Sequence, residues 1–565
     1  MSAPASALAS IEEVRAKVEQ TYLAWTRYRH FSQEQVDAVV EAVSGAARTH
    51  AARLAEMAVA ETGYGNARDK LAKNMLAAET LPQRMRSMHT LGVLNEDREQ
   101  GIVEIGEPMG VIAAILPTTN PTSTAIYKTL IALKSGNGIV LSPHPRARAC
   151  TCETAALLAA AAEQAGAPEG IVGCIGGSTI ESTTELMRHR RTAVILSTGG
   201  SGIVRAAYSS GKPAFGVGPG NVPVLVDVSA DIGHALENII RGKTFDYGTL
   251  CSSEQTVVAE RSLRDRMLAE FRARKAHLCD AGQTAALERL LFTKDFAICP
   301  DCVGQPASKM ARMAGFTVPD DTPVLLVELG GIGKEHPLSA EKLTTVLGLY
   351  FVEHFDAALA ACEAVLHFGG LGHTCGIYSS DDQRTREYAR RMPAFRVVAN
   401  SPTSLGSTGA TTNLFPAMTL GCGAVAGNST SDNVGPLHLV NIKRLAYGVP
   451  SVAPAGEQMT REQVIGAVKR YLERRGMTPA TVPLAHARGS ATAGGAATTA
   501  SPPATPVAVV DFVCEDDVRR AVRDSRKIFI GPKTIVTPAA RDYANMHDAL
   551  VMTEGPRPQG RLDSE

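Results

Sequence analysis

Cys251 lies in a polar loop, FDYGTLCSSEQ, that joins a helical segment to an apolar run. A cysteine thiolate attacks carbonyl carbons, and the oxyanion that forms then needs a hydrogen-bond donor. An aldehyde attacked in this way gives a thiohemiacetal, which can lose a hydride to a nicotinamide and become a thioester. A free cysteine is more often a small buried hydrophobe, so this thiol, one of eleven, does not define an active site alone.

A donor for such an oxyanion is available at Asn120, in the loop PTTNPT. Composition alone reads this residue as the start of an Asn-Pro turn, so both interpretations stay open at this point. Two glycine-rich segments, Thr198–Gly202 and Gly216–Gly220, do not match GxGxxG and by themselves indicate turns. Cys299 and Cys302 form a CxxC without a second such pair or a nearby histidine pair, and no metal site is predicted.

The composition argues against several partner classes. Lys plus Arg and Asp plus Glu both total 57, so the formal net charge is zero and no basic field exists for a nucleic acid or an anionic membrane. The N-terminal segment does not read as a signal peptide, and no apolar run is long enough to span a bilayer. Eleven scattered cysteines fit reduced thiols. We therefore expect a cytoplasmic enzyme of several structural units that binds neither nucleic acid nor membrane.

The elements that must position Cys251 and Asn120 follow from hydrophobic patterning. Ser32 and Gln35 form a capping box at the start of a helix, and the first hundred residues are predicted to be helical. From Val103 onward, apolar runs and helical segments alternate in β-α-β order, which predicts a parallel sheet with its ligands at the carboxyl ends of the strands. The loops PTTNPT, SPHPRA and STGGSG would meet there and bind a nucleotide. Strands are predicted at 111–116, 139–141, 171–175 and 193–196, and helices at 124–133 and 155–165.

The chain after Cys251 continues the α/β pattern. The loop-rich run from 401 to 444 is dominated by Asn, Ser, Thr and Gly, as is typical of loops that line a site or an interface. Further strands are predicted at 323–328, 346–352 and 396–400, and helices at 309–315 and 357–367.

The C-terminal part differs in composition. Thr460 and Gln463 frame a capping box, which opens an amphipathic helix. Its apolar stripe consists of Val464, Ile465, Val468, Tyr471 and Leu472. Residues 485–506 form a tract rich in Ala, Gly, Pro and Thr that cannot bury enough apolar surface to order itself. The remainder reads as helix, strand, turn and helix, too small for a stable core unless it docks.

Five segments together resemble the CoA-acylating aldehyde dehydrogenases: EPMGVIAAILPTTNPTSTAIYKTLIALKSGNGIVLSPHPRA, SSGKPAFGVGPGNVPV, KTFDYGTLCSSEQ, FGGLGHT and LGCGAVAGNSTSDNVGPLHLVN. The resemblance covers about Val14 to Arg444 and includes the aldehyde-dehydrogenase half of the bifunctional alcohol/aldehyde dehydrogenases. It implies an α/β aldehyde dehydrogenase-like fold with a Rossmann-like cofactor domain, an α/β catalytic domain and a small oligomerisation extension. The expected divisions are 1–236 for the cofactor domain with its N-terminal helices, 237–445 for the thiol domain, 446–484 for the tethered helix, 485–506 for the linker and 507–565 for a small extension.

The resemblance also implies roles for individual residues. Cys251 occupies the position of the family's nucleophile. Asn120 occupies that of the oxyanion asparagine, whose amide would act with the backbone N–H of Cys251. NAD is implied as cofactor and coenzyme A as cosubstrate. The residues expected to bind the cofactor are Thr118, Ser142, Pro143, His144, Pro145, Thr198, Gly199, Gly200, Ser201, Gly216, Gly218 and Glu341.

One departure from the hydrolytic branch of the family predicts the product. Hydrolytic aldehyde dehydrogenases resemble this chain but have a glutamate base where Gly216 stands, 35 residues before Cys251. Without that base the thioester should survive until coenzyme A attacks it, and the product would be an acyl-CoA. Glu254 is a weaker substitute for the base, and His373 either tunes the thiol or is a structural histidine. The alternatives are a hydrolytic enzyme that releases free acid and a non-catalytic binding module.

The resemblance also suggests candidate partners, a candidate location and a substrate class. The tethered helix resembles the encapsulation peptides of bacterial microcompartments, so shell proteins are candidate partners and a microcompartment is a candidate location. A homo-oligomer is expected from the family. The sequence ends without an alcohol dehydrogenase half, so reduction to an alcohol is not predicted. The expected substrate is a short-chain aldehyde, either acetaldehyde or propionaldehyde, with sulfoacetaldehyde as a substituted alternative.

Overall fold

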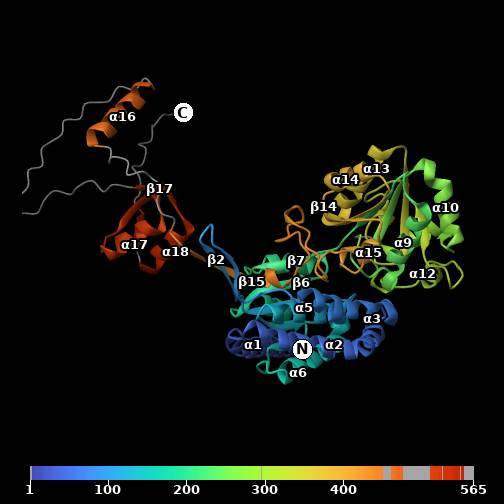
Figure 1. Cartoon of the computed structure of the whole chain (residues 1–565), viewed down its shortest axis with the longest axis horizontal. Coiled ribbons are helices and arrows are strands. Elements are labelled where there is room, and N and C mark those ends of the chain that lie inside the picture. The colour runs from blue at the N-terminus through green and yellow to red at the C-terminus, as the bar shows by residue number, and fades with distance from the viewer. Residues whose placement is uncertain are drawn as a thin grey trace, which may run out of the picture. The chain divides into compact units, whose positions relative to one another are not determined.

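The computed structural model describes residues 3–293, 296–448, 460–474, 510–524, 526–547 and 549–552 (Figure 1). The chain divides into two units, Met1–Val452 and Ala453–Glu565. The predicted linker at 485–506 lies outside the described residues. No helix among those described has both the length and the apolar composition needed to cross a membrane.

The first unit begins with long helices, as predicted. Helices α1 (Ala3–Tyr28), α2 (Gln33–Thr62) and α3 (Ala67–Met75) follow one another, and the capping box of Ser32 and Gln35 at the start of α2 is confirmed. Helix α2 packs against α3, α5 and α6. The prediction of helix up to residue 100 is wrong at its end. Strand β1 (Gly92–Asp97) pairs antiparallel with β2 (Ile102–Pro108), whose other edge pairs with β15 (Val440–Ala446).

A five-stranded parallel sheet forms the first α/β layer, and it confirms the predicted strands. Its order is β5-β4-β3-β6-β7, and β3 and β4 are buried along their whole length because helices cover both faces. The strands are β3 (Val111–Ile115), β4 (Gly138–Ser142), β5 (Val172–Cys174), β6 (Thr192–Thr198) and β7 (Ala214–Val217), and the helices between them are α5 (Pro121–Lys134), α6 (Arg148–Gln164), α7 (Ile180–Arg188) and α8 (Ser201–Tyr208).

A seven-stranded parallel sheet forms the second α/β layer, in the order β10-β11-β12-β9-β8-β13-β14. Since β8 pairs with β9 and β13, the two sheets divide between Val217 and Val222. The predicted boundary after residue 236 falls inside helix α9 instead. The strands are β8 (Val222–Val226), β9 (Glu254–Glu260), β10 (His277–Leu278), β11 (Leu325–Glu328), β12 (Val346–Val352), β13 (Gly372–Tyr378) and β14 (Ala394–Ala399), and the helices include α9 (Ile232–Thr244), α10 (Arg264–Ala273), α12 (Ala307–Met313), α13 (Phe355–Val365) and α14 (Asp382–Arg391).

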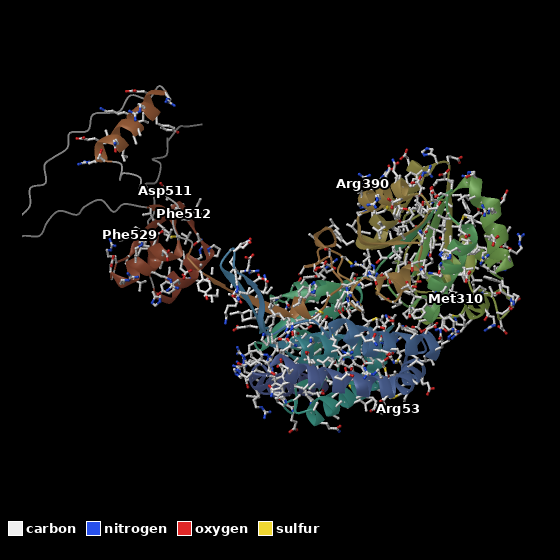
Figure 2. The ribbon with its side chains drawn as sticks, viewed as in Figure 1. Arg53, Met310, Arg390, Asp511, Phe512 and Phe529 are labelled. Atoms are coloured by element: carbon white, nitrogen blue, oxygen red, sulfur yellow. The ribbon has the colours of Figure 1, made fainter. Side chains whose placement is uncertain are left out.

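The second unit contains a helix and a small α/β fold. Helix α16 (Arg461–Arg474) begins at the predicted capping box, with reciprocal bonds between Thr460 and Gln463. A parallel sheet of β16 (Val510–Val513), β17 (Ile528–Val536) and β18 (Leu550–Met552) carries α17 (Glu515–Arg523) and α18 (Pro538–His547). Strands β16 and β18 were not predicted, because strands of four and three residues are too short to be distinguished from loops. Figure 2 labels Phe512 of β16, whose side chain is 56% exposed.

Candidate active site

Cys251 lies on the wall of a cavity of about 750 Å³ at the carboxyl ends of the first sheet. The strand ends that border the cavity are those of β3, β4, β6 and β7, where the loops predicted to bind a nucleotide begin. The opposite wall includes Ile298, Pro300 and Val303 from the segment between α11 (Ala281–Leu291) and α12. The thiol therefore lines the same cavity as the loops that were predicted to bind a nucleotide.

His373 is in direct contact with the thiol. Its Nε2 lies 3.2 Å from Cys251 Sγ, and its Nδ1 lies 2.9 Å from Thr374 Oγ1. That hydroxyl oxygen also accepts a bond from Arg396 Nε at 3.4 Å. The hydroxyl oxygen can accept a second bond, so in the tautomer with the proton on Nδ1 the imidazole donates to Thr374 Oγ1 and the lone pair of Nε2 faces the thiol. The geometry favours the interpretation of His373 as a residue that tunes the thiol.

Burial keeps both members of this pair uncharged. Burial raises the pKa of Cys251 to about 12, and the carboxylate of Glu341 adds to the effect. Burial lowers the pKa of His373 to about 3, and the nearby Arg396 guanidinium lowers it further. The resting pair is therefore a thiol and a neutral imidazole, and the imidazole takes the proton only as the C–S bond forms, because its pKa lies far below that of the thiol.

Asn120 lies on the same cavity wall and is 8% exposed. It is the residue before the first turn of α5, which agrees with the Asn-Pro turn predicted from composition. An asparagine at this position usually caps the helix with its side chain, but here no such bond forms. Its Nδ2 donates to Thr119 Oγ1 at 3.0 Å, which leaves a second N–H of the amide available. The amide can thus serve a bound oxyanion.

Most of the residues expected to bind the cofactor line this cavity together. They are Thr118, Ser142, Pro143, His144, Pro145, Thr198, Gly199, Gly200, Gly218 and Glu341. Glu341 is further held by the backbone N–H of Gly220, which donates to its Oε1 at 3.1 Å. Ser201 and Gly216 are not on the wall of this cavity. Ser201 lines a neighbouring pocket of about 470 Å³, because the first turn of α8 directs it to the other side.

Gly216 is in contact with the side chains of Tyr208 and Val204 from α8. The hydroxyl of Tyr208 accepts from the Gly216 N–H at 3.0 Å and donates to the Gly216 carbonyl at 3.2 Å. A Cβ added at Gly216 would lie 2.9 Å from both Tyr208 Cε2 and Val204 Cγ1. The side-chain position at residue 216 is thus filled by α8, and no carboxylate from there reaches the thiol.

The cavity fits a dinucleotide on two observations. A Cβ added at Gly200 or Gly218 would meet no atom within 4 Å, so these positions leave the cavity open where a phosphate could approach the backbone. Gly200 is also the N-cap of α8 and makes no side-chain cap bond, so the first N–H groups of that helix remain available. Backbone N–H groups at a helix N-terminus attract phosphate.

The sequence profile of the Aldehyde dehydrogenase family matches residues 5–287. The crystal structure of an acetylating aldehyde dehydrogenase from Geobacillus thermoglucosidasius resembles the chain with a TM-score of 0.78 and 44% identity, over 79% of this chain and 99% of that chain. The chain belongs to the aldehyde dehydrogenase family.

Two curated relatives indicate the branch of the family. The bifunctional aldehyde-alcohol dehydrogenase AdhE of Escherichia coli K12 is 42% identical over 445 residues, which are 78% of this chain and 50% of that protein. The chain thus spans about half the length of that relative. The succinate-semialdehyde dehydrogenase (acetylating) of Clostridium kluyveri is 35% identical over 434 residues, which are 77% of this chain and 95% of that protein. The chain is a member of the CoA-acylating aldehyde dehydrogenases.

Glu254, the substitute base considered from the sequence, does not line the cavity of this aldehyde dehydrogenase. Its side chain is buried, and its Oε1 accepts from the backbone N–H of Thr403 at 2.7 Å. Burial raises its pKa to about 7. Among the described residues, no group of three or more His, Cys, Asp or Glu side chains is arranged to hold a metal ion.

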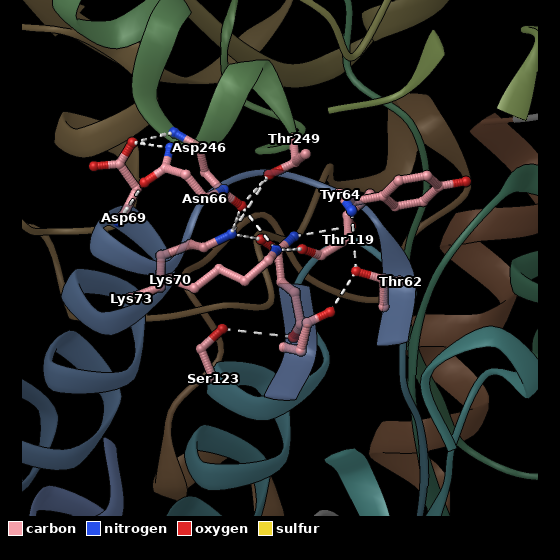
Figure 3. A network of polar contacts seen from close by, with 12 residues as sticks. Thr62, Tyr64, Asn66, Asp69, Lys70, Lys73, Thr119, Ser123, Asp246 and Thr249 are labelled. Atoms are coloured by element: carbon pink, nitrogen blue, oxygen red, sulfur yellow. Dashed lines mark hydrogen bonds and ion pairs between the residues drawn. The ribbon is translucent and has the colours of Figure 1, made fainter. Parts of the chain in front are cut away.

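The sequence did not reveal a buried polar cluster beside Asn120. Lys70 and Lys73 of α3 both pair with the Asp246 carboxylate, in the loop before the thiol (Figure 3). Helix α3 reads as a surface helix from its sequence, since lysine is almost never fully buried unless it is paired. A sequence signal for the cluster is absent, because Asp246 is 173 residues away from Lys73 along the chain.

Proposed function

We propose that this aldehyde dehydrogenase oxidises a short-chain aldehyde to its acyl-CoA with NAD and coenzyme A. The observation that carries the proposal is the contact of Cys251 with a neutral His373, together with a glycine at residue 216, where the hydrolytic enzymes have the glutamate base. A thiol beside a base supports acyl transfer, and the lack of a carboxylate at residue 216 favours transfer to a thiol over transfer to water.

The first step forms a bond between Cys251 Sγ and the aldehyde carbonyl carbon. The thiol proton moves to His373 Nε2 as the C–S bond forms, because the separated ion pair is unfavourable at rest. The carbonyl oxygen becomes an oxyanion, which takes hydrogen bonds from the Asn120 amide and the Cys251 backbone N–H. A nicotinamide cofactor, when bound, would accept the hydride that the thiohemiacetal releases, and the product on Cys251 is a thioester.

The second step transfers the acyl group. The thiolate of coenzyme A attacks the thioester carbonyl carbon, a new C–S bond forms, and Cys251 leaves and takes a proton back from His373. A propionaldehyde dehydrogenase from Rhodopseudomonas palustris, with 28% identity and a TM-score of 0.70, carries bound CoA and an acylated cysteine. That state is the intermediate that this scheme requires.

The cavity favours NAD over NADP. No lysine or arginine stands among the described residues of its wall, which supports NAD; Arg146, a cation beside it, donates from Nη1 to the hydroxyl of Tyr64 on that wall at 3.3 Å. Burial lowers the pKa of His144, and the neighbouring Arg146 lowers it further, so this histidine is uncharged near neutral pH. An engineered glycolyl-CoA reductase of the same fold, 27% identical, binds NADP+, so the preference has to be measured.

A second, smaller cavity supports a short aldehyde. It has a volume of about 210 Å³ and includes Leu250, the residue before the nucleophile, and Lys73, whose ammonium contacts Asn120. Most of the remaining wall is apolar: Ala72, Leu76, Phe245, Leu405, Ala410 and Met418. Arg241, an exposed residue of the same wall, is the feature that would favour an anionic substituent such as a sulfonate.

One assay tests the proposal. Purified protein is mixed with NAD and propionaldehyde, and NADH is followed with and without coenzyme A while propionyl-CoA and propionate are quantified. Turnover that depends on coenzyme A and yields propionyl-CoA is expected, and Cys251→Ala should abolish it. Propionate formed without coenzyme A would support the hydrolytic alternative, and no NADH the non-catalytic one. The ratio of kcat/KM for propionaldehyde and sulfoacetaldehyde, in wild type and Arg241→Met, identifies the substrate class.

Two surfaces support the proposed partners. In the first unit, the β1-β2-β15 sheet exposes Val93, Ile442 and Leu445 by 59%, 42% and 46%, as an oligomerisation extension would. Ile442→Asp should lower the mass measured by sedimentation equilibrium if this sheet joins the copies. In the second unit, one face of α16 exposes Val464 and Val468 by 45% and 51%.

An exposed apolar helix face suits docking to a microcompartment shell protein. Val464→Glu with Val468→Glu should then abolish co-sedimentation with purified shell protein. Glu462→Gln, which changes the polar face of α16, is the matched control and should leave the co-sedimentation intact. Unchanged co-sedimentation of both variants would remove the role of α16.

A further inference from the structure

Three buried charged residues meet beside the oxyanion asparagine. Lys70 and Lys73 from α3 are 2% and 3% exposed, and Asp246, from the loop that leads to Cys251, is fully buried. Lys70 Nζ lies 3.0 Å from Asp246 Oδ2, and Lys73 Nζ contacts the same oxygen. Figure 3 shows both ammonium groups directed at this carboxylate. The cluster connects helix α3 with the loop that carries the thiol.

The two lysines differ in their other contacts, and Lys73 Nζ also donates to Thr249 Oγ1 at 3.4 Å. Lys73 Nζ donates to Asn120 Oδ1 at 2.5 Å, whereas Lys70 Nζ donates to the backbone carbonyl of Thr119 at 3.0 Å. An ammonium group is only a donor, so the amide oxygen of Asn120 must face Lys73. The NH2 group of the amide is therefore directed away from Lys73, toward the cavity side where it also bonds Thr119 Oγ1. Lys73 thus decides which end of the amide is available to an oxyanion.

The carboxylate that holds Lys73 is itself fixed. Asp246 accepts from the backbone N–H of Asn66 at 2.8 Å and from Thr249 Oγ1 at 2.5 Å, and its own N–H donates to Asp69 at 2.8 Å. Its φ of +49° lies in the left-handed region, which strains a residue other than glycine and is typical of functional sites. Although burial alone would raise the pKa of Asp246, the two ammonium groups outweigh it, and the net pKa lies below the usual value.

We propose that Lys73 is a positioning residue, which fixes the amide of Asn120 in the orientation that donates to the oxyanion. The inference rests on the proposed function, because it needs the oxyanion of the thiohemiacetal and thioester steps. Lys73 acts through Asn120 and does not itself bond to the reacting atoms. The electrostatic pairing with Asp246 keeps the ammonium in place when substrate enters.

A double-mutant cycle tests the proposal. Lys73→Met is expected to lower kcat by about 10- to 100-fold with little change in KM, since a misdirected donor weakens only the transition state. Asn120→Ala alone is expected to cost about 100- to 1,000-fold. Adding Lys73→Met to Asn120→Ala should cost nothing more, because the group that Lys73 orients is gone. An equal fold-loss in both backgrounds would show a general structural role and overturn the proposal.

Lys70→Met is the matched control. It removes the other ammonium of the same Asp246 carboxylate from the same helix but leaves the contact with Asn120 intact. Its loss of kcat should be at least fivefold smaller than that of Lys73→Met, while the two variants should lose similar thermal stability. Equal losses of kcat would contradict the proposal.

Two further measurements cover the cases in which Lys73→Met does not fold or the acyl group is released as free acid. If Lys73→Met does not fold, Lys73→Gln is compared in the same two backgrounds under the same criterion. The same comparison of variants is repeated on the rate of the single-turnover burst of NADH without coenzyme A, which reports thioester formation. A wild-type protein that gives this burst but then releases acid would refute the CoA step alone, whereas a non-additive cycle in the burst would still support Lys73.

Discussion

Two buried polar groups lie beside the same cavity and respond to burial in opposite ways. The pair of Cys251 and His373 has no bonded counter-charge, and burial drives both residues to their neutral forms. In the cluster of Lys70, Lys73 and Asp246, the net pKa of the carboxylate stays below its usual value because two ammonium groups bond to it. Burial disfavours the charged form of each of these groups, and a bonded opposite charge offsets that effect. The offset is complete for Asp246 but partial for Lys73, whose pKa burial lowers to about 8 although Asp246 is bonded to it. The pair of Cys251 and His373 can therefore transfer a proton, and the cluster of Lys70, Lys73 and Asp246 can fix the positions of its side chains.

Among substitutions that keep the Cys251 thiol, removal of the imidazole of His373 should have the largest effect on activity. His373→Ala should lower kcat by about 100- to 10,000-fold, the usual contribution of a positioned base, because no other described side chain is in hydrogen-bond contact with Cys251 Sγ. The measurement is the single-turnover burst of NADH. Thr374→Val keeps the imidazole and removes the partner of Nδ1 together with one acceptor of Arg396, so its loss should be much smaller. A His373→Ala burst within threefold of wild type would contradict the role of the base.

Neutralising the Asp246 carboxylate should destabilise the folded protein, because the charged cluster loses its negative charge. Asp246→Asn leaves two buried ammonium groups without a counter-charge, which should cost about 3–5 kcal/mol in the free energy of unfolding. Chemical denaturation at pH 7 measures the loss. Asp321→Asn, which removes the partner of Lys275 in an exposed ion pair, is the control and should change little. A small effect of Asp246→Asn would mean that the cluster is not charged.

The sign of the pH dependence follows from the lowered pKa of Asp246. A carboxyl group whose pKa is lower in the folded state stabilises the protein fully above its unfolded pKa of about 4. That stabilisation is lost as the pH falls through the folded value. Wild type should therefore lose more stability than Asp246→Asn between about pH 5 and pH 2.

The protonation of Cys251 can be read from its reactivity. Because burial raises its pKa to about 12, the thiolate fraction should rise about tenfold per pH unit from pH 6 to pH 10 without levelling off. The rate of alkylation by iodoacetamide measures this fraction, and Cys251→Ser supplies the blank for the other cysteines. A rate that levels off near pH 8 would show a thiolate stabilised by a cation, and the distinction between the two regions would fail.

Sequence patterning predicted the parallel sheets because their strands are continuous apolar runs. The run at 111–116 became β3, and that at 346–352 became β12. Strands β1 and β2 were missed, since β1 is exposed or half-exposed along its length and lacks an apolar run. The strands that end at the cavity brought nine of the expected cofactor residues to one wall, because the carboxyl ends of parallel strands share an edge; Glu341 reaches it from the loop before β12.

The chemistry of the site was less accessible to sequence reasoning. The roles proposed for Cys251 and Asn120 came from resemblance, and the sequence left two interpretations of His373 open, between which its 3.2 Å contact with the thiol favours the tuning role. Lys73 gave no signal, because its burial depends on Asp246, a residue remote in sequence. Long-range pairs of charges are properties of the packed fold, and helix periodicity does not contain them.

The smallest expected effect concerns Gly216, which stands where the hydrolytic enzymes have a glutamate base. Gly216→Ala should cost about 1–3 kcal/mol in the free energy of unfolding, because its Cβ would lie 2.9 Å from Tyr208 and Val204 in a packed region. Gly218→Ala, two residues on, should cost almost nothing, since no atom lies within 4 Å of its Cβ. Thermal unfolding of the two variants measures the difference. Equal stabilities would mean that Tyr208 yields readily, and then a glutamate at residue 216 could reach the thiol and raise hydrolysis.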